Sequence, residues 1–451
     1  MPKRINEDMA RQLYVQCQRA YDSVKDSSGI IKNGIPAPDY FDDAYNIPAE
    51  LLFKELYRSR DTSQDIRIDF DYKLLELINK NATFNSNSLL LGARKNTPLK
   101  KFEVFFQIYF RKDPSAPDLF KKQITLGDIK FAWCSERSFS RLVYQFESDE
   151  NLTEGGLNTL VYDKSNLYKR FRNERFPQLK DESNLHAIKA TVRANHIIDA
   201  TNKAATAFRN FMSCANVAQA FSSQSVSLST NVPKIKSAVV YTGVFLVKNS
   251  ADKKIEILRT DSKRHNLPDQ SLKLTVYQSK MALFNNLLKT FRDKSSPTAK
   301  RVRYVTLEFA SAIDTDDPNL RQLGFWRCLE IATRRSSENR KEKDIIKIFQ
   351  NYHSKALHWQ QQGQLILDMR NIYVHQGVSS NTNKPNDFYL NWSQQYAEAA
   401  LRVLVYLYNN RSIWKTEDDI DIFFNHYSQP DRALELAGKL LAARNKSRKT
   451  A

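Results

Sequence analysis

The hydrophobic pattern of the chain changes near residue 318, and this change limits the fold more than any other feature of the sequence. Before it, runs rich in aromatic and β-branched residues predict strands, as at Phe102–Phe110, Ile129–Trp133 and Ala238–Val247. After it, apolar residues recur at three- and four-residue steps, which is the period of a helix. We therefore expect an α+β fold, in which a mixed region with a β-sheet precedes an all-α helical bundle.

The pattern divides the 451 residues into three regions. Residues 1–180 are expected to form an N-terminal α+β region. Residues 181–317 are expected to form a helix plus a β-sheet region that either stands alone or continues the first, and residues 318–451 a C-terminal helical domain with a basic tail. The helices predicted before residue 318 are 5–24, 185–222 and Lys280–Phe291, and the further strands are Phe139–Phe146, Ile255–Leu258, Leu272–Tyr277 and Tyr304–Phe309. The helices predicted after it are 319–335, 342–358, 361–376, 393–409, 420–424 and 433–443.

Neither a metal site nor a nucleotide cofactor is expected. The aspartates Asp314, Asp316 and Asp317 could suggest a metal, but an N-cap followed by Pro318 at the first helical position explains them more simply. Glycine is scarce, with 11 residues among 451, and neither G-x-G-x-x-G nor G-x-x-x-x-G-K occurs. Since Rossmann and P-loop sites need glycines at fixed places, the sequence argues against both.

The charge of the chain implies an acidic partner. There are 69 Lys and Arg residues against 50 Asp and Glu residues, which gives a formal net charge of +19. Nucleic acid is the first candidate partner and an anionic membrane surface the second, although net charge also serves solubility alone. The four cysteines are scattered, which suits reduced thiols, and we find neither a signal-peptide core nor an apolar run long enough to span a bilayer. We therefore expect a cytoplasmic protein without a membrane partner.

One segment combines residue types that suit chemistry on RNA. Arg370-Asn371-x-x-x-His375 closes a predicted helix, and Gly377 stands where a C-terminal cap would fall. The bare spacing of Arg and His is expected by chance in so basic a chain, and a second pair, Arg259 and His265, lies in a polar stretch that reads as a solvated loop. Arg370 and His375 are about 140° apart around the helix. Asn371, by contrast, lies on the same helix face as His375.

These residues suit the cleavage of RNA by its own 2′-hydroxyl. The reaction needs a group that exchanges a proton near neutral pH, which histidine does, and the helix dipole favours the charged form of His375. It also needs a fixed positive fork on the phosphate, which arginine supplies. Asn371 could orient either group by a hydrogen bond. The products would be a 2′,3′-cyclic phosphate and a 5′-hydroxyl, no metal would be required, and DNA would be inert because it lacks the attacking hydroxyl.

The motif at Arg370, Asn371 and His375, late in a helical region, resembles that of the HEPN superfamily of ribonucleases. The run Leu323–Ala332, in which Glu330 follows aromatic and apolar residues, is similar to the first helix of Apea-like HEPN domains, and Tyr373 fits the surroundings of the motif. The resemblance covers residues 318–410.

The resemblance implies a helical bundle that forms a homodimer, with two motifs across a shared cleft. It implies a toxin or effector in anti-phage defence or abortive infection, working with an antitoxin, a sensor or another defence protein. Arg370 and His375 become the expected catalytic residues and Asn371 the supporting polar residue. Glu330 is expected to orient Arg370 or to act in the domain core, and Tyr373 to support the site.

Two questions stay open at the level of the sequence. Basic residues between the two similar segments form either an RNA-contacting patch or a solvated helix face: Arg334, Arg335, Arg340, Lys341 and Lys343. The competing function is non-enzymatic, namely a nucleic-acid-binding module or a scaffold subunit with a degenerate HEPN domain. A third option is an antitoxin-like partner protein, but the intact Arg370 and His375 argue against it.

Overall fold

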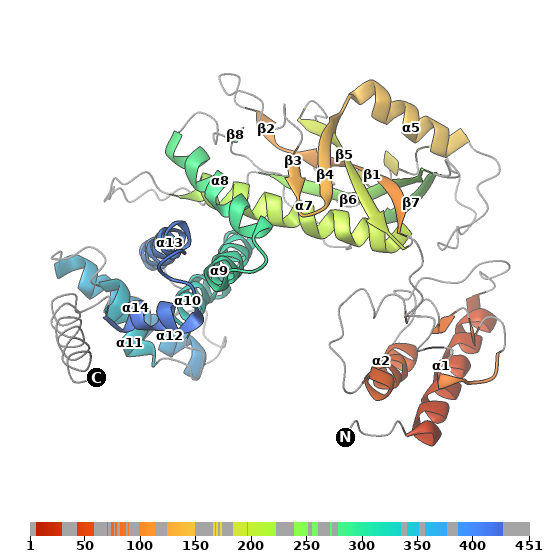
Figure 1. Cartoon of the computed structure of the whole chain (residues 1–451), viewed down its shortest axis with the longest axis horizontal. Coiled ribbons are helices and arrows are strands. Elements are labelled where there is room, and N and C mark those ends of the chain that lie inside the picture. The colour runs from red at the N-terminus through yellow and green to blue at the C-terminus, as the bar shows by residue number, and fades with distance from the viewer. Residues whose placement is uncertain are drawn as a thin grey trace, which may run out of the picture.

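The protein has an α+β fold, seen in a computed structural model of the whole chain (Figure 1). The structure describes residues 6–28, 43–57, 99–112, 124–148, 184–195, 197–221, 239–250, 255–259, 271–272, 278–334, 341–350, 357–376 and 387–426, together with single positions in 70–89 and 166–173. Among the predicted elements, the helix at 433–443, the basic tail at 444–449 and all but the first residue of the strand Leu272–Tyr277 lie outside the described residues.

A small helical unit begins the described chain. Helices α1 (Glu7–Ser28) and α2 (Asp43–Tyr57) lie side by side, which confirms the helix predicted at 5–24. Their apolar faces share a core that also takes in positions up to Leu89 and no residue of the later elements. The Tyr14 hydroxyl donates to the carbonyl of Ala82 at 2.8 Å, and this hydrogen bond links the backbone at Ala82 to α1.

An antiparallel sheet follows, in the strand order β3-β4-β5-β1-β6-β7. The strands are β1 (Lys100–Tyr109), β3 (Ile124–Leu126), β4 (Ile129–Cys134), β5 (Leu185–Ala194), β6 (Val240–Asn249) and β7 (Ile255–Arg259), and a separate parallel pair joins β2 (Arg111–Lys112) to β8 (Ser271–Leu272). Because β1 pairs with β5 along their whole length, one sheet spans the predicted division at residue 180. The strands predicted at 102–110, 129–133, 238–247 and 255–258 are confirmed.

Helices cover both faces of the sheet (Figure 1). On one face, α7 (Ile197–Ala220) packs on the alternate residues Phe102, Val104 and Phe106 of β1. On the other face, α5 (Glu136–Ser148) packs near Phe105. This alternation follows from the two-residue period of a strand, which sends successive side chains to opposite faces.

Two predictions before residue 195 are wrong because the residue period was misjudged. The predicted strand Phe139–Phe146 is helix α5, in which Phe139, Leu142 and Phe146 are buried at helical spacing. The predicted helix 185–222 begins with strand β5, whose buried residues Ala190, Val192 and Ala194 alternate with less buried ones. Only its second part, α7, is helical. Alanine favours helices in isolation, but pairing with β1 and β4 outweighs that propensity.

The predicted strand Tyr304–Phe309 is also wrong, since it lies within α9 (Pro297–Asp314). Ser296 caps this helix by accepting a hydrogen bond from the amide of Ala299, and Pro297 occupies the first turn. Val302, Val305 and Phe309 are buried on one face, while Tyr304 is exposed. The aromatic and β-branched residues that suggested a strand are therefore spaced so that they are buried on one face of a helix.

A layer of helices completes the structure and begins before the predicted boundary at residue 318. It contains α8 (Gln278–Arg292), α9, α10 (Pro318–Thr333), α11 (Glu342–Gln350), α12 (Leu357–Gln376), α13 (Asp387–Asn409) and α14 (Glu417–His426). This confirms the helix predicted at 280–291 and, as far as they are described, those predicted between 319 and 424. One continuous core joins the layer to β1 and α7. None of the helices in the described parts of the chain is long and apolar enough to cross a membrane.

Local signals set the start of α10 and its approach to α9. The Asp317 carboxylate accepts from the amides of Asn319 at 2.7 Å and Leu320 at 3.1 Å, so the expected N-cap is confirmed. Gly324 allows the close approach of the two helices, because a Cβ added there would lie 2.7 Å from the Cβ of Ala312. Helices α9 and α10 therefore form a tightly packed antiparallel pair that positions the residues described next.

Candidate active site

Helix α12 carries the motif and is fixed by its first half. The ring of Trp359 stacks on Tyr396 of α13 with centroids 4.2 Å apart, and its indole nitrogen donates to the carbonyl of Phe349 in α11 at 2.8 Å. Ile366 and Leu367 continue the buried face about two turns later. Arg370 follows on that same face because residues three and four apart lie one above the other.

Arg370 of α12 faces two other helices of the layer, α10 and α11. Its side chain is 16% exposed, with Nη2 lying 3.8 Å from Glu330 Oε1 of α10 and Nη1 lying 3.4 Å from Glu342 Oε1 of α11. Nη1 also donates to Asn371 Oδ1 at 3.0 Å. The guanidinium carbon lies 5.7 Å from the ring centroid of Trp326, within the range of a cation–π interaction.

Trp326 orients the carboxylate that faces Arg370. Its indole nitrogen donates to Glu330 Oε1 at 2.6 Å, one helical turn along α10. The ring of Trp326 is buried, so this hydrogen bond begins from a rigid anchor. Trp326 and Glu330 thus form a unit that restricts where the guanidinium can lie.

The structure brings together some of the expected residues and adds others. Arg370, Asn371 and Glu330 meet, and the sequence suggested the contact between Glu330 and Arg370. The roles of Trp326 and Glu342 were missed. The four-residue spacing of Trp326 and Glu330 is a signal that could have linked these two residues. No such signal exists for Glu342, because only the packing of α11 on α12 brings it to Arg370.

The remaining motif residues lie on the last turns of α12. Tyr373 is half-buried, and His375 follows Asn371 by one helical turn. The helix backbone includes His375, but its side chain lies outside the described part of the structure, as does Gly377. Earlier in the helix, Ile366 is buried, whereas Leu365 is exposed.

Three of the five cations expected to contact RNA are described, and all three are exposed: Arg334, Lys341 and Lys343. Arg334 directly follows α10, while Lys341 and Lys343 flank Glu342. They therefore lie in sequence next to the two carboxylates that face Arg370. Arg335 and Arg340 lie outside the described residues.

A second arginine fixes the end of the helical layer near this site. Arg301 of α9 donates from Nε to Glu417 Oε2 of α14 at 2.8 Å, and its Nη2 lies 3.2 Å from Asp421. Its Nη1 donates to the carbonyl of Ala332 at 3.4 Å, two residues after Glu330. The start of α9 is thereby held against the last turn of α10, which carries the Glu330 carboxylate.

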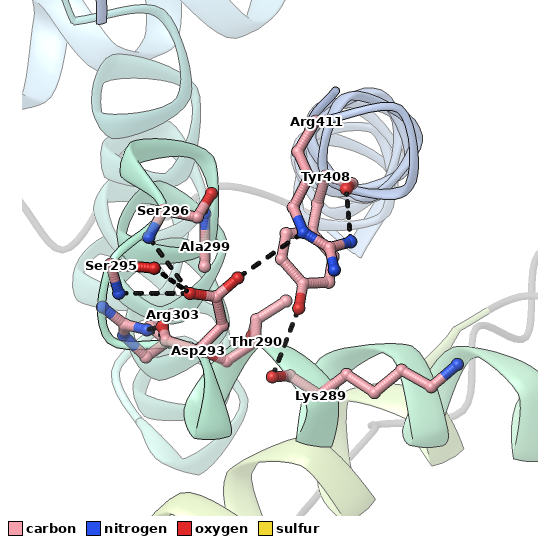
Figure 2. A network of polar contacts seen from close by, with 9 residues as sticks. All are labelled: Lys289, Thr290, Asp293, Ser295, Ser296, Ala299, Arg303, Tyr408 and Arg411. Atoms are coloured by element: carbon pink, nitrogen blue, oxygen red, sulfur yellow. Dashed lines mark hydrogen bonds and ion pairs between the residues drawn. The ribbon is translucent and has the colours of Figure 1, made fainter. Parts of the chain in front are cut away.

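A polar junction between α8 and α9 ties both helices to the end of α13 (Figure 2). Asp293 accepts from the amides of Ser295 and Ser296, each at 3.1 Å, and lies 3.7 Å from Nε of Arg411. Burial raises the pKa of Asp293, but the hydrogen bonds from Ser296 and Ser295 and the charge of Arg411 outweigh it and hold the pKa below its usual value. The Tyr408 hydroxyl closes the junction by donating to the carbonyl of Lys289 at 3.4 Å.

Among the described residues, no group of three or more His, Cys, Asp and Glu side chains could hold a metal ion. The four cysteines are free thiols. Burial raises the pKa of the Cys214 and Cys328 thiols, so both stay protonated at neutral pH.

Comparison with family models, with curated proteins and with solved structures found no match to this chain.

Proposed function

We propose that the protein is a metal-independent endoribonuclease of the HEPN type. The observation that carries the proposal is the setting of Arg370, whose guanidinium lies near a helix end between two half-exposed carboxylates and a tryptophan ring. Asn371 adjoins it, and His375 follows one turn later on the same helix. An arginine fork beside a histidine supplies the two functions that cleavage by a 2′-hydroxyl requires.

In the proposed reaction, Arg370 binds the scissile phosphate and stabilises the negative charge that builds on it. The phosphate replaces Glu342 as the partner of Nη1, while Asn371 holds the other side of that nitrogen. His375 exchanges the proton with the 2′-hydroxyl or the leaving 5′-oxygen. The bond from phosphorus to the 5′-oxygen breaks as the 2′-oxygen attacks, leaving a 2′,3′-cyclic phosphate and a 5′-hydroxyl.

The supporting residues act through Arg370. Glu330, oriented by Trp326, limits the positions of the guanidinium. Tyr373, half-buried on the same helix, is assigned a supporting role. Arg334, Lys341 and Lys343 are exposed beside these residues in sequence and are placed to attract the RNA backbone. The net charge of +19 supports the same partner.

The biological setting is proposed from the same resemblance. The protein would act in the cytoplasm as a toxin or effector of anti-phage defence or abortive infection, paired as a homodimer through the HEPN domain. An antitoxin, sensor or other defence protein would control it, and the region before residue 318 would sense a trigger, bind a partner or guide the RNA.

The test is RNA cleavage by the purified full chain in the presence of EDTA. We expect the wild type to cut RNA and leave DNA intact, whereas Arg370→Ala and His375→Ala each lose activity by at least about a hundredfold. Arg327→Ala is the matched control, since Arg327 is an arginine of α10 that is 65% exposed and pairs with Glu308 away from Arg370. That variant should cut like the wild type.

The non-catalytic alternative is favoured by one observation, namely that two carboxylates already face Arg370 in the free protein. If all variants and the wild type bind RNA and none cuts it, with or without candidate triggers, the protein is a binding or scaffold subunit. Toxicity on expression that both site substitutions relieve would support the enzyme.

A further inference from the structure

A pocket lined by both polar and apolar groups lies between α7, the turn that joins β3 to β4, and the end of α8. Its volume is about 290 Å³, room for on the order of ten water molecules. The lining residues are Leu126, Gly127, Asp128, Ile129, Asp199, Asn202, Lys203, Thr206, Ala207, Asn210, Phe291 and Lys294. None of them belongs to the candidate active site.

The lining combines polar groups with an aromatic ring. Asn202, Thr206 and Asn210 recur at four-residue steps along α7 and present amides and a hydroxyl, which both donate and accept hydrogen bonds. Phe291, from the last turn of α8, is half-buried and offers part of its ring. An unstacked nucleobase needs such a set, because its edge carries donors and acceptors and its face stacks on aromatic rings.

The charged residues of the lining balance, with Lys203 and Lys294 against Asp128 and Asp199, and the excess of positive charge comes from Arg292 next to Phe291. Lys203 is neutralised by Asp199 at 2.9 Å, but Lys294 lines the pocket and is exposed. Arg292 is also exposed, and within the described part of the chain it donates to a neutral group, the carbonyl of Thr125 at 3.0 Å. One further carboxylate, Asp128, lines the pocket and offsets part of this charge.

The positive charge continues from the rim into α9. Lys289 and Lys300 are exposed on either side of Lys294, and the one acidic residue between them is Asp293. Asp293 is engaged by the serine amides and Arg411 in the junction of Figure 2. A polyanion bound along residues 289–300 can therefore pair with lysines that Asp293 does not neutralise.

This basic segment lies at the same end of the helical layer as Arg370. The hydrogen bond from Arg301 to the carbonyl of Ala332 holds the start of α9 against the last turn of α10. That turn carries Glu330, which faces Arg370. A strand bound along the start of α9 is thus directed toward the end of the layer that bears the candidate site.

We infer that the pocket binds one unstacked nucleotide of a single-stranded RNA whose phosphates run over Lys294 and Arg292. The base lies against Phe291 and the amides of α7, and the next phosphates follow the start of α9. The inference rests on the proposed function for the identity of the polymer, and it assigns to the pocket the selection of single-stranded over duplex RNA.

The test measures binding without cleavage, by fluorescence anisotropy with a labelled single-stranded RNA whose riboses are 2′-O-methylated. Thr206→Trp fills the pocket from an exposed position of α7 and is expected to weaken binding roughly tenfold. Ser140→Trp, which adds the same ring at an exposed position of α5 outside the pocket, should bind like the wild type. A thermal unfolding midpoint equal to that of the wild type shows that each variant is folded.

Charge is tested separately by the salt dependence of the same binding. Lys294→Gln should reduce the slope of log K against log salt by about one. Lys100→Gln, at an exposed position of β1 outside the pocket, should leave the slope unchanged. Equal affinities of Thr206→Trp and Ser140→Trp, or equal slopes of the two lysine variants, would overturn the inference.

The two proposals fail in different ways. If the wild type cuts ordinary RNA but the pocket variants bind the methylated strand like the wild type, the pocket has no RNA role and the nuclease proposal stands. If the pocket variants lose binding while no RNA is cut, the pocket assignment stands and the nuclease proposal falls.

Discussion

Two arginines of the helical layer each face two carboxylates, and they differ in burial and distance. Arg301 is 7% exposed, donates to Glu417 at 2.8 Å and lies 3.2 Å from Asp421. Arg370 is 16% exposed, and its carboxylates lie 3.4 and 3.8 Å away and are themselves nearly half exposed. The first arrangement has shorter contacts and one carboxylate, Asp421, that is only 13% exposed, whereas both contacts of the second are long enough for a partner to be exchanged.

The difference separates a structural cation from one that can bind a ligand. Removing one partner from a buried ion pair strands a charge and is costly, whereas an exposed ion pair contributes little. A phosphate can therefore replace a carboxylate at Arg370 with a small loss, but not at Arg301. Burial and distance, rather than the number of facing acids, distinguish the two sites.

The largest expected effect follows from removing each cation in turn. Arg301→Met should lower the free energy of unfolding by about 3 kcal/mol, because Asp421 and the Ala332 carbonyl lose their partner in a buried place. Arg370→Met should change it by less than about 1 kcal/mol while abolishing RNA cleavage. Urea denaturation of both variants checks this, and equal losses of stability would remove the distinction.

A second substitution disturbs the packing on which both sites depend. Gly324→Ala places a Cβ 2.7 Å from the Cβ of Ala312, so α9 and α10 must separate at a cost of about 2 kcal/mol. The double variant Ala312→Gly/Gly324→Ala restores the space and should recover part of that stability. Calorimetric unfolding of the two variants is the measurement, and a single variant as stable as the wild type would show that the approach is not tight.

The junction at Asp293 allows a pH-dependent test of a contact that stabilises the fold and takes no part in the proposed reaction. The folded-state pKa of Asp293 is below its usual value. The stability that the ionised carboxylate contributes is therefore complete above the unfolded-state pKa of about 3.9 and is lost as pH falls through the folded-state pKa. Asp293→Asn should therefore be less stable than the wild type by about 1 kcal/mol at neutral pH. The difference should vanish at pH values below the folded pKa, and a constant difference from pH 7 to pH 2 would contradict this assignment.

The smallest effect concerns the exchangeable partner of Arg370. Glu342→Gln removes a competing charge and should raise RNA cleavage at subsaturating substrate roughly threefold. Glu308→Gln is the matched control, because Glu308 pairs with the exposed Arg327 instead. Steady-state rates decide the matter, and a loss of activity in Glu342→Gln would mean that Glu342 holds Arg370 in its working position.

Local signals in the sequence were sufficient to predict an element where residues of a single kind determine it. Asp317 before Pro318 predicted the start of α10, and the aromatic run at 102–110 predicted β1. The failures at α5, β5 and α9 arose where residue preference and residue period disagree. In each case burial against another element selected the structure, and that information is not local.

The candidate site was predictable only in part for the same reason. Arg370 and Asn371 are neighbours in the chain, so their contact follows from the motif itself. Trp326 and Glu342 reach Arg370 only through the packing of α10 and α11 on α12. Which arginine of a basic chain is structural and which is open also depends on burial, as the contrast between Arg301 and Arg370 shows.

The most direct test of the central claim is the chemical identity of the RNA ends. Mass spectrometry of fragments made by the full chain in EDTA should find 2′,3′-cyclic phosphates and 5′-hydroxyls, and Arg370→Ala should give no fragments above background. Fragments with 5′-phosphates, or cleavage that persists in Arg370→Ala, would contradict the account.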